Sequence, residues 1–267
     1  MRASAALVAA LLLASAGAAG ADAPFAPPTT DTIAPGPLGD AIRFGRKTAE
    51  QTSASVKANV GAGLSCTSCH VQGARTPNAA PWVGLWGVYP EYDPRSGRVI
   101  TLADRINECF RRSMNGKPLP LDSVAMRGLL SFIWWLSKDV PTGVSVTGRG
   151  FKSIEAPRPA DLVKGRTLYT EKCAACHGAS GQGVKGAGGQ VVFPALWGPR
   201  SFNIGAGMAR LDTAAAFVKA KMPLGGAALS DQEAYDVAAY FTRQPRPDFK
   251  AKKGDWPNGD KPRDARY

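Results

Sequence analysis

Two short cysteine–histidine motifs carry the strongest chemical signal in the sequence. They are CTSCH at residues 66–70 and CAACH at residues 173–177, and both have the pattern C-x-x-C-H. Thiols at this spacing can reach the two vinyl groups on one edge of a porphyrin, and the adjacent histidine can then ligate the iron. One such motif alone could be a redox dithiol or half of a zinc site. Two motifs predict two covalently bound haem c groups, held by Cys66, Cys69, His70, Cys173, Cys176 and His177.

The distal haem ligands must come from outside these motifs. The chain has only two histidines and both belong to the motifs, so neither haem can have two histidine ligands. If the irons are six-coordinate, their distal ligands are thioethers, a lysine or the one cysteine left over. The candidates are a lysine and the sulfur-containing residues Met114, Met126, Met208, Met222 and Cys109.

The remaining cysteine, Cys109, lies in a segment rich in arginine, TLADRINECFRRSMNG at residues 101–116. Thr101 followed by Asp104 is typical of a helix start, and Asn-Gly at residues 115–116 of a helix end. Residues three and four positions apart share a helix face, so the expected neighbours of Cys109 are Arg105, Ile106, Arg112 and Ser113. Nearby positive charge favours a thiolate, which is both a nucleophile and a metal ligand, and would also bind a small dianion. The alternative is an amphipathic helix with a buried free cysteine and solvated arginines.

The elements that must position these residues occur twice along the chain. Each motif is followed by a loop containing Leu-Trp-Gly, at residues 85–87 and 196–198. We expect helices at residues 38–56 and 160–172 before the motifs, and at 121–138 and 230–243 closing each half. The last begins with a capping box from Ser230 to Glu233. Residues 140–159 are rich in glycine, proline and threonine and predict a linker between the halves. Residues 23–36 and 245–267 are proline-rich and polar with no helical period, so we expect them to lie extended over the surface or to be mobile.

This repetition predicts an all-α fold of two tandem cytochrome c domains with extended loops and a tail. The expected boundaries are a signal peptide at residues 1–21, an N-terminal cytochrome c domain at 22–145 and a C-terminal one at 146–245. The extended tail is then residues 246–267. The first domain would hold the first haem and the active site, and the second domain would hold the second haem.

The N-terminus and the net charge predict where the protein works. Arg2, the apolar run at residues 5–13 and the small residues at 16–21 are typical of a secretory signal peptide. The alternative is that this N-terminal segment is a membrane anchor that is not cleaved. Outside it, no segment reaches the ~20 apolar residues that a membrane-spanning helix requires. A periplasmic location follows. The net charge of +12 favours a small anionic substrate or an acidic redox partner, and an exported protein does not meet nucleic acid.

The segment NECFRRSMNGKPLP at residues 107–120, with the two haem motifs around it, resembles the tetrathionate-forming thiosulfate dehydrogenase family of periplasmic dihaem cytochromes. The likeness includes SFNIGAGM at 201–208 and KMP at 221–223, and it covers most of the mature chain. It implies the oxidation of two thiosulfates to tetrathionate, which can also run in reverse. Electrons would leave to a small periplasmic acceptor such as a cytochrome c or a high-potential iron–sulfur protein.

The same resemblance implies roles for individual residues. Cys109 would be the distal ligand of the first haem and the catalytic sulfur. The residues that would line the substrate site are Arg95, Arg105 and Ser113. Met222 would ligate the second haem, and Lys221 would replace it in some redox states; the alternative is a simple Met222 ligand beside a solvent-exposed Lys221.

Two other functions remain open from the sequence. A non-catalytic dihaem electron carrier would need no reactive group, and Met114 or Met126 would then ligate the first haem. The haem subunit of a periplasmic sulfur-oxidising complex also uses a cysteine-ligated haem. Its cysteine has a different sequence context, and it works with a partner cytochrome and a carrier protein. Turnover of thiosulfate by the purified chain alone distinguishes the dehydrogenase from both.

Overall fold

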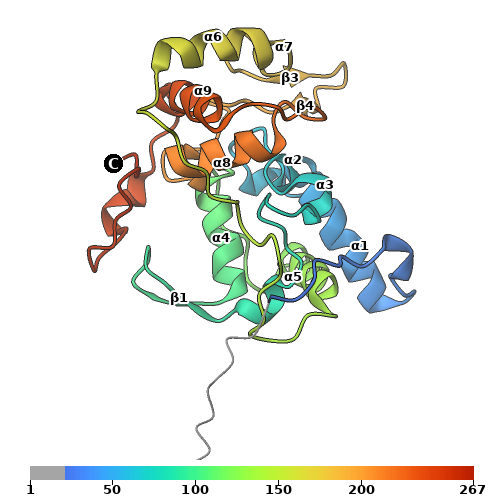
Figure 1. Ribbon diagram of the computed structural model, residues 1–267. Coiled ribbons are helices and arrows are strands. Elements are labelled where there is room, and N and C mark those ends of the chain that lie inside the picture. The colour runs from blue at the N-terminus through green and yellow to red at the C-terminus, as the bar shows by residue number, and fades with distance from the viewer. Residues whose placement is uncertain (1–21) are drawn as a thin grey trace, which may run out of the picture.

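The computed structural model describes residues 22–267, so the predicted signal peptide at residues 1–21 lies outside the described part. This part of the chain is mainly helical, with two short antiparallel hairpins (Figure 1). The helices are α1 (Pro37–Glu50), α2 (Thr52–Ser55), α3 (Val71–Ala74), α4 (Leu102–Arg112), α5 (Val124–Ser137), α6 (Leu162–Lys172), α7 (Ala174–His177), α8 (Leu211–Lys221) and α9 (Asp231–Arg243). The hairpins are β1 (Glu91–Asp93) with β2 (Arg98–Ile100), and β3 (Val184–Lys185) with β4 (Val191–Phe193). The all-α fold class is confirmed; the hairpins were not expected.

In the first half, α1 crosses α5 at a pair of glycines. A Cβ atom added to Gly45 would lie 1.9 Å from the carbonyl oxygen of Gly128, so only glycine permits this close approach. The α5 face beyond the crossing is buried and includes Leu129, Phe132 and Ile133, each 1% exposed. This helix begins at Val124 rather than at residue 121 because the Ser123 side chain accepts a hydrogen bond from the backbone of the new helix.

The second half repeats this arrangement with α6 and α9. A Cβ atom at Gly165 would lie 2.0 Å from the carbonyl oxygen of Asp236, so these two helices also cross at a glycine. The predicted capping box at Ser230 and Glu233 is present at the start of α9. Tyr169 is buried and packs against the partly buried Trp197, with ring centroids 4.9 Å apart, and against Tyr240 of α9. The duplication expected from the sequence is therefore visible as two similar helix crossings.

The helix that carries Cys109, α4, starts as predicted but ends earlier. Thr101 and Asp104 form a capping box at its N-terminus. Its last residue is Arg112, because the following backbone turns back: the amide of Gly116 bonds to the carbonyl of Phe110 at 2.9 Å. Figure 1 shows α4 running from the β1–β2 hairpin toward α8 of the second half.

The segments expected to be extended are anchored by specific contacts. In the linker, Gly150 accepts a hydrogen bond from the amide of Ala80 at 2.8 Å, and Ala23 pairs with Val146 in a parallel bridge. The C-terminal tail contains one short 3-10 helix at Lys250–Gly254 and lies beside α4 and the β1–β2 hairpin (Figure 1). Within residues 22–267, none of the helices is long and apolar enough to cross a bilayer.

Candidate functional site

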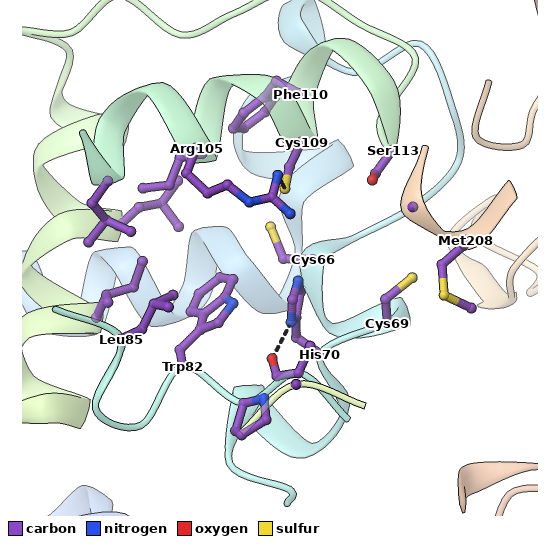
Figure 2. Close-up of a pocket in the computed structure, with 18 of the residues that line it drawn as sticks. Cys66, Cys69, His70, Trp82, Leu85, Arg105, Cys109, Phe110, Ser113 and Met208 are labelled. Carbon is purple, nitrogen blue, oxygen red and sulfur yellow. Dashed lines mark hydrogen bonds between the residues drawn. The ribbon is translucent and has the colours of Figure 1, made fainter. Parts of the chain in front are cut away.

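A cavity of about 320 Å³ brings the first cysteine–histidine motif together with α4. Figure 2 shows α4 on one side of this cavity and the motif on the other, with Cys109 and His70 facing it from opposite sides. The predicted site residues that line the cavity are Cys66, Cys69, His70, Arg105, Cys109 and Ser113. Helical spacing explains the α4 set, because residues four positions apart lie on one face.

Both motif histidines are oriented by a backbone carbonyl. His70 Nδ1 lies 2.6 Å from the carbonyl oxygen of Ala80, and His177 Nδ1 lies 2.9 Å from that of Pro194. A carbonyl can only accept, so Nδ1 carries the proton and Nε2 keeps a free lone pair for a metal. Burial lowers the pKa of His70 to about 4, which keeps its imidazole neutral. In both halves, the residue providing this carbonyl lies within five residues before the Leu-Trp-Gly sequence.

The two motif cysteines of the first half suit covalent attachment of a haem. Burial raises the pKa of the Cys66 and Cys69 thiols to about 12, so neither position favours a free thiolate. Thr52 fixes the start of the motif: its hydroxyl accepts from the Cys66 amide at 3.0 Å. Two thiols and one oriented neutral imidazole, facing an apolar cavity, form the donor set that a c-type haem requires.

Cys109 and Arg105 form the reactive part of the cavity wall. Arg105 Nη1 lies 3.5 Å from Cys109 Sγ. The neighbouring cysteine raises the pKa of Arg105 by more than burial lowers it, so the guanidinium remains charged. Ser113, one turn beyond Cys109, also faces the cavity (Figure 2). This wall can hold a small anion against a sulfur nucleophile.

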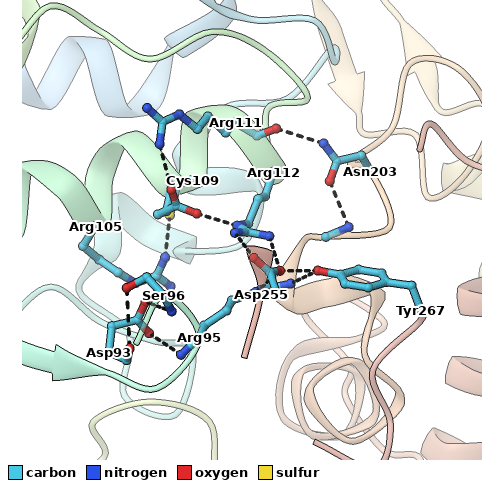
Figure 3. Close-up of polar contacts among 12 residues, drawn as sticks. Asp93, Arg95, Ser96, Arg105, Cys109, Arg111, Arg112, Asn203, Asp255 and Tyr267 are labelled. Atoms are coloured by element: carbon cyan, nitrogen blue, oxygen red, sulfur yellow. Dashed lines mark hydrogen bonds and ion pairs between the residues drawn. The ribbon is translucent and has the colours of Figure 1, made fainter. Parts of the chain in front are cut away.

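Arg95 has a different placement from the other residues expected at the substrate site. It is not among the described residues that line the cavity. Its Nε lies 2.8 Å from a carboxylate oxygen of Asp255, and its Nη2 lies 2.7 Å from the hydroxyl of Tyr267 (Figure 3). The C-terminal tail therefore binds this arginine in the structure.

Several residues line this cavity that sequence reasoning did not place there. Tyr89 lines the cavity, and burial raises the pKa of its hydroxyl, which stays protonated. Met208 and Phe202 come from the second half of the chain yet line the cavity of the first. Both lie in the SFNIGAGM segment of the resemblance, but only the tertiary structure shows which cavity that segment meets. Of the other methionine candidates, Met114 lines the cavity, whereas Met126 is 0% exposed in the core of α5.

The second motif lies at the junction of α6 and α7. Cys173 caps the C-terminus of α6, and α7 ends at His177. Met222 follows the last residue of α8, Lys221, and is partly buried against the same core as Cys173. Burial lowers the pKa of Lys221. The ligand roles of Met222 and Lys221 stay predictions.

Comparisons with known proteins match both halves. The family described as SoxA/TsdA, cytochrome c domain, matches residues 55–142, and the family Cytochrome C oxidase, cbb3-type, subunit III, matches residues 160–241. The thiosulfate dehydrogenase of Psychrobacter arcticus is 48% identical over 90% of this chain and 73% of its own length. That of Allochromatium vinosum is 46% identical over 85% of this chain and 86% of its own.

A solved structure agrees with these sequence matches. The thiosulfate dehydrogenase (TsdBA) from Marichromatium purpuratum superposes with a TM-score of 0.81 at 42% identity, covering 84% of this chain. The match covers 50% of that solved chain. The L-cysteine S-thiosulfotransferase subunit SoxA of Rhodovulum sulfidophilum is a weaker match, 28% identical over 43% of this chain.

These matches confirm the two tandem cytochrome c domains and, with them, two covalently bound haem c groups. The exact boundaries at residues 145 and 245 stay predictions. From its sequence relatives and its fold, the chain belongs to the thiosulfate dehydrogenase family of dihaem c-type cytochromes.

Proposed function

We propose that this protein oxidises two thiosulfates to tetrathionate in the periplasm, with Cys109 as the distal ligand of the first haem and the catalytic sulfur. The observation that supports this most directly is the shared cavity: Cys109 faces it from α4, opposite His70, with Arg105 Nη1 3.5 Å from its sulfur. A guanidinium beside a cavity-facing sulfur is typical of the surroundings of a reactive cysteine.

The cysteine sulfur forms and then releases one sulfur–sulfur bond. The Cys109 thiolate and the outer sulfur of a first thiosulfate form one sulfur–sulfur bond, and two electrons leave. In the product, Cys109 Sγ–S–SO₃⁻, the outer sulfur of thiosulfate is bonded to Cys109 Sγ. The outer sulfur of a second thiosulfate then attacks the sulfur bonded to Cys109. This step releases tetrathionate and restores the thiolate, so atoms and charge balance. When bound, the two haems can each accept one of the two electrons. The bond exchange is reversible.

Positive charge must offset the electrostatic repulsion between the two thiosulfate dianions that meet at Cys109. Arg105 remains charged beside Cys109, and its fixed position means that it need not reorganise during the reaction. Ser113 can donate a hydrogen bond to a sulfonate oxygen from the same face of α4. We also propose a second positive charge from Arg95, whose guanidinium is bound by the C-terminal tail in the structure.

At the second haem, His177 and Met222 would hold the iron, and Lys221 would replace Met222 in the oxidised state. The lowered pKa of Lys221 supports this exchange, because only a deprotonated amine can bind iron. Thioether ligation raises a haem's potential, whereas thiolate ligation at Cys109 lowers it. Electrons would therefore leave through the second haem to a small periplasmic acceptor, such as a cytochrome c or a high-potential iron–sulfur protein.

The test uses the purified, haem-loaded chain without any partner. Its intact mass should exceed that of the peptide by two haems, and it should reduce an artificial electron acceptor when thiosulfate is added. A non-catalytic electron carrier would show no such turnover. The haem subunit of a sulfur-oxidising complex would need its partner proteins. Absence of turnover by the isolated chain would therefore contradict the proposal.

A further inference from the structure

One carboxylate of the C-terminal tail binds two arginines of the first domain. The side chain of Asp255 is 5% exposed. Its two oxygens lie 2.7 and 2.8 Å from Nη1 and Nη2 of Arg112, and one of them lies 2.8 Å from Nε of Arg95. The hydroxyl of Tyr267 donates to the same carboxylate (Figure 3). No predicted site residue other than Arg95 takes part in this cluster.

The cluster holds the flank of α4 that is next to Cys109. Arg112 also bonds to Glu108 at 2.5 Å, one turn earlier on the helix. With 3.6 residues per turn, Arg112 and Glu108 lie about 60° and 100° around the helix from Cys109. A contact at that angle resists rotation of α4 about its axis, and such rotation would move the Cys109 sulfur out of the cavity.

The cluster also reaches the segment that leads into α4. Arg95 lies in the turn between β1 and β2, and β2 runs directly into the Thr101 cap of α4. The backbone carbonyl of Arg95 accepts from the amide of Trp256 at 2.7 Å, and its guanidinium lies 4.7 Å from the Trp256 ring centroid. Asp255 therefore connects the turn before α4 to the last turn of α4, from a tail that follows the second domain.

The negative charge of Asp255 is needed to balance this cluster. Burial alone would raise its pKa, but the hydrogen bonds from Arg112, Tyr267 and Arg95 outweigh burial and hold the pKa below its ordinary value. The carboxylate is therefore ionised at neutral pH. The Arg112 side chain is only 10% exposed, so loss of the carboxylate would leave a nearly buried guanidinium with Glu108 as its one ion-pair partner among the described residues.

We propose that Asp255 is a positioning residue: by binding Arg112 and Arg95 it fixes the rotation of α4 and so the direction of the Cys109 sulfur. The tail of the electron-exit domain would thereby orient the reactive group of the other domain. The catalytic consequence rests on the proposed function, whereas the structural consequence does not.

The test compares two tail variants of the haem-loaded protein, Asp255→Asn and Asp264→Asn. Asp264 is a matched control because it is also a nearly buried tail carboxylate, 7% exposed, bound to an arginine, Arg210, at 2.8 Å. It contacts the start of α8 instead of α4. The readouts are hydrogen exchange of residues 107–114, the ferric spectrum of the first haem, and kcat and KM for thiosulfate. Tyr267→Phe, which removes one hydroxyl from the cluster, is a third and milder variant.

For Asp255→Asn we expect faster exchange in the last turn of α4, an altered ferric spectrum of the first haem only, and kcat lower by about ten- to a hundredfold with little change in KM. Tyr267→Phe should shift each readout less, in the same direction, and Asp264→Asn should match the wild type. The proposal is wrong if Asp255→Asn keeps the wild-type spectrum and kcat, or if Asp264→Asn changes them equally. If the wild type itself does not oxidise thiosulfate, the proposed function fails, and hydrogen exchange of α4 still decides whether Asp255 fixes this helix.

Discussion

Replacement of Arg105 by glutamine should weaken thiosulfate binding while leaving the first haem and Cys109 in place. Arg105 Nη1 lies 3.5 Å from Cys109 Sγ, so it can also reach an anion whose sulfur meets that cysteine. Loss of one hydrogen bond to a charged group costs about 1.5–3 kcal/mol. Because each 1.4 kcal/mol is about a factor of ten in affinity, KM should rise roughly ten- to a hundredfold.

Steady-state oxidation of thiosulfate with an artificial acceptor gives this KM. Arg111→Gln is the matched control, because Arg111 lies on the same helix but is 45% exposed and pairs with Glu108 at 3.0 Å outside the cavity. Arg105→Lys keeps the positive charge but lacks the planar guanidinium with its paired N–H donors. Its KM should therefore lie between those of the wild type and Arg105→Gln. The reasoning about electrostatics is refuted if Arg105→Gln and Arg111→Gln have the same KM as the wild type.

Three further predictions test other parts of the structure. Asn203→Ala removes a hydrogen bond of 2.9 Å to the Arg111 carbonyl in the last turn of α4 and one of 3.1 Å to the Asn115 side chain just after it; the free energy of unfolding in guanidinium chloride should fall by about 2 kcal/mol, and an unchanged midpoint would contradict this. Lys221→Ala should alter the ferric spectrum of the second haem alone; an unaltered spectrum means that Met222 ligates it in both states. Acid should loosen the tail, because the folded-state pKa of Asp255 is below its ordinary 3.8: its stabilisation is complete above that pH and is lost as the pH falls below it. Hydrogen exchange of residues 249–258 should therefore rise in strong acid in the wild type, and an equal rise in Asp255→Asn would argue against this cause.

Features set by neighbouring residues could be predicted from the sequence. The capping boxes at Thr101 and Ser230 form as expected because each needs only residues three positions apart. The two cysteine–histidine motifs and the helical face that joins Arg105, Cys109 and Ser113 depend on equally short spacings. These local rules were sufficient for the fold class and for most of the candidate active site.

Features that depend on distant residues could not be predicted. Asp255 is 143 positions from Arg112 and 160 from Arg95, and no property of the sequence separates it from the other aspartates of the tail. The entry of Met208 into the cavity of the first domain depends on how the two domains pack. The β1–β2 hairpin has only three residues in each strand, too few for a clear alternation of polar and apolar residues.

The most direct test of the account is thiosulfate oxidation by the haem-loaded Cys109→Ala variant. Intact mass should show both haems still attached, and the ferric spectrum should change for the first haem only. We expect turnover to fall by about a thousandfold or more, because the variant lacks the sulfur that bonds to the substrate. Near-normal oxidation of thiosulfate by this variant would contradict the catalytic role of Cys109 and favour a non-catalytic electron carrier.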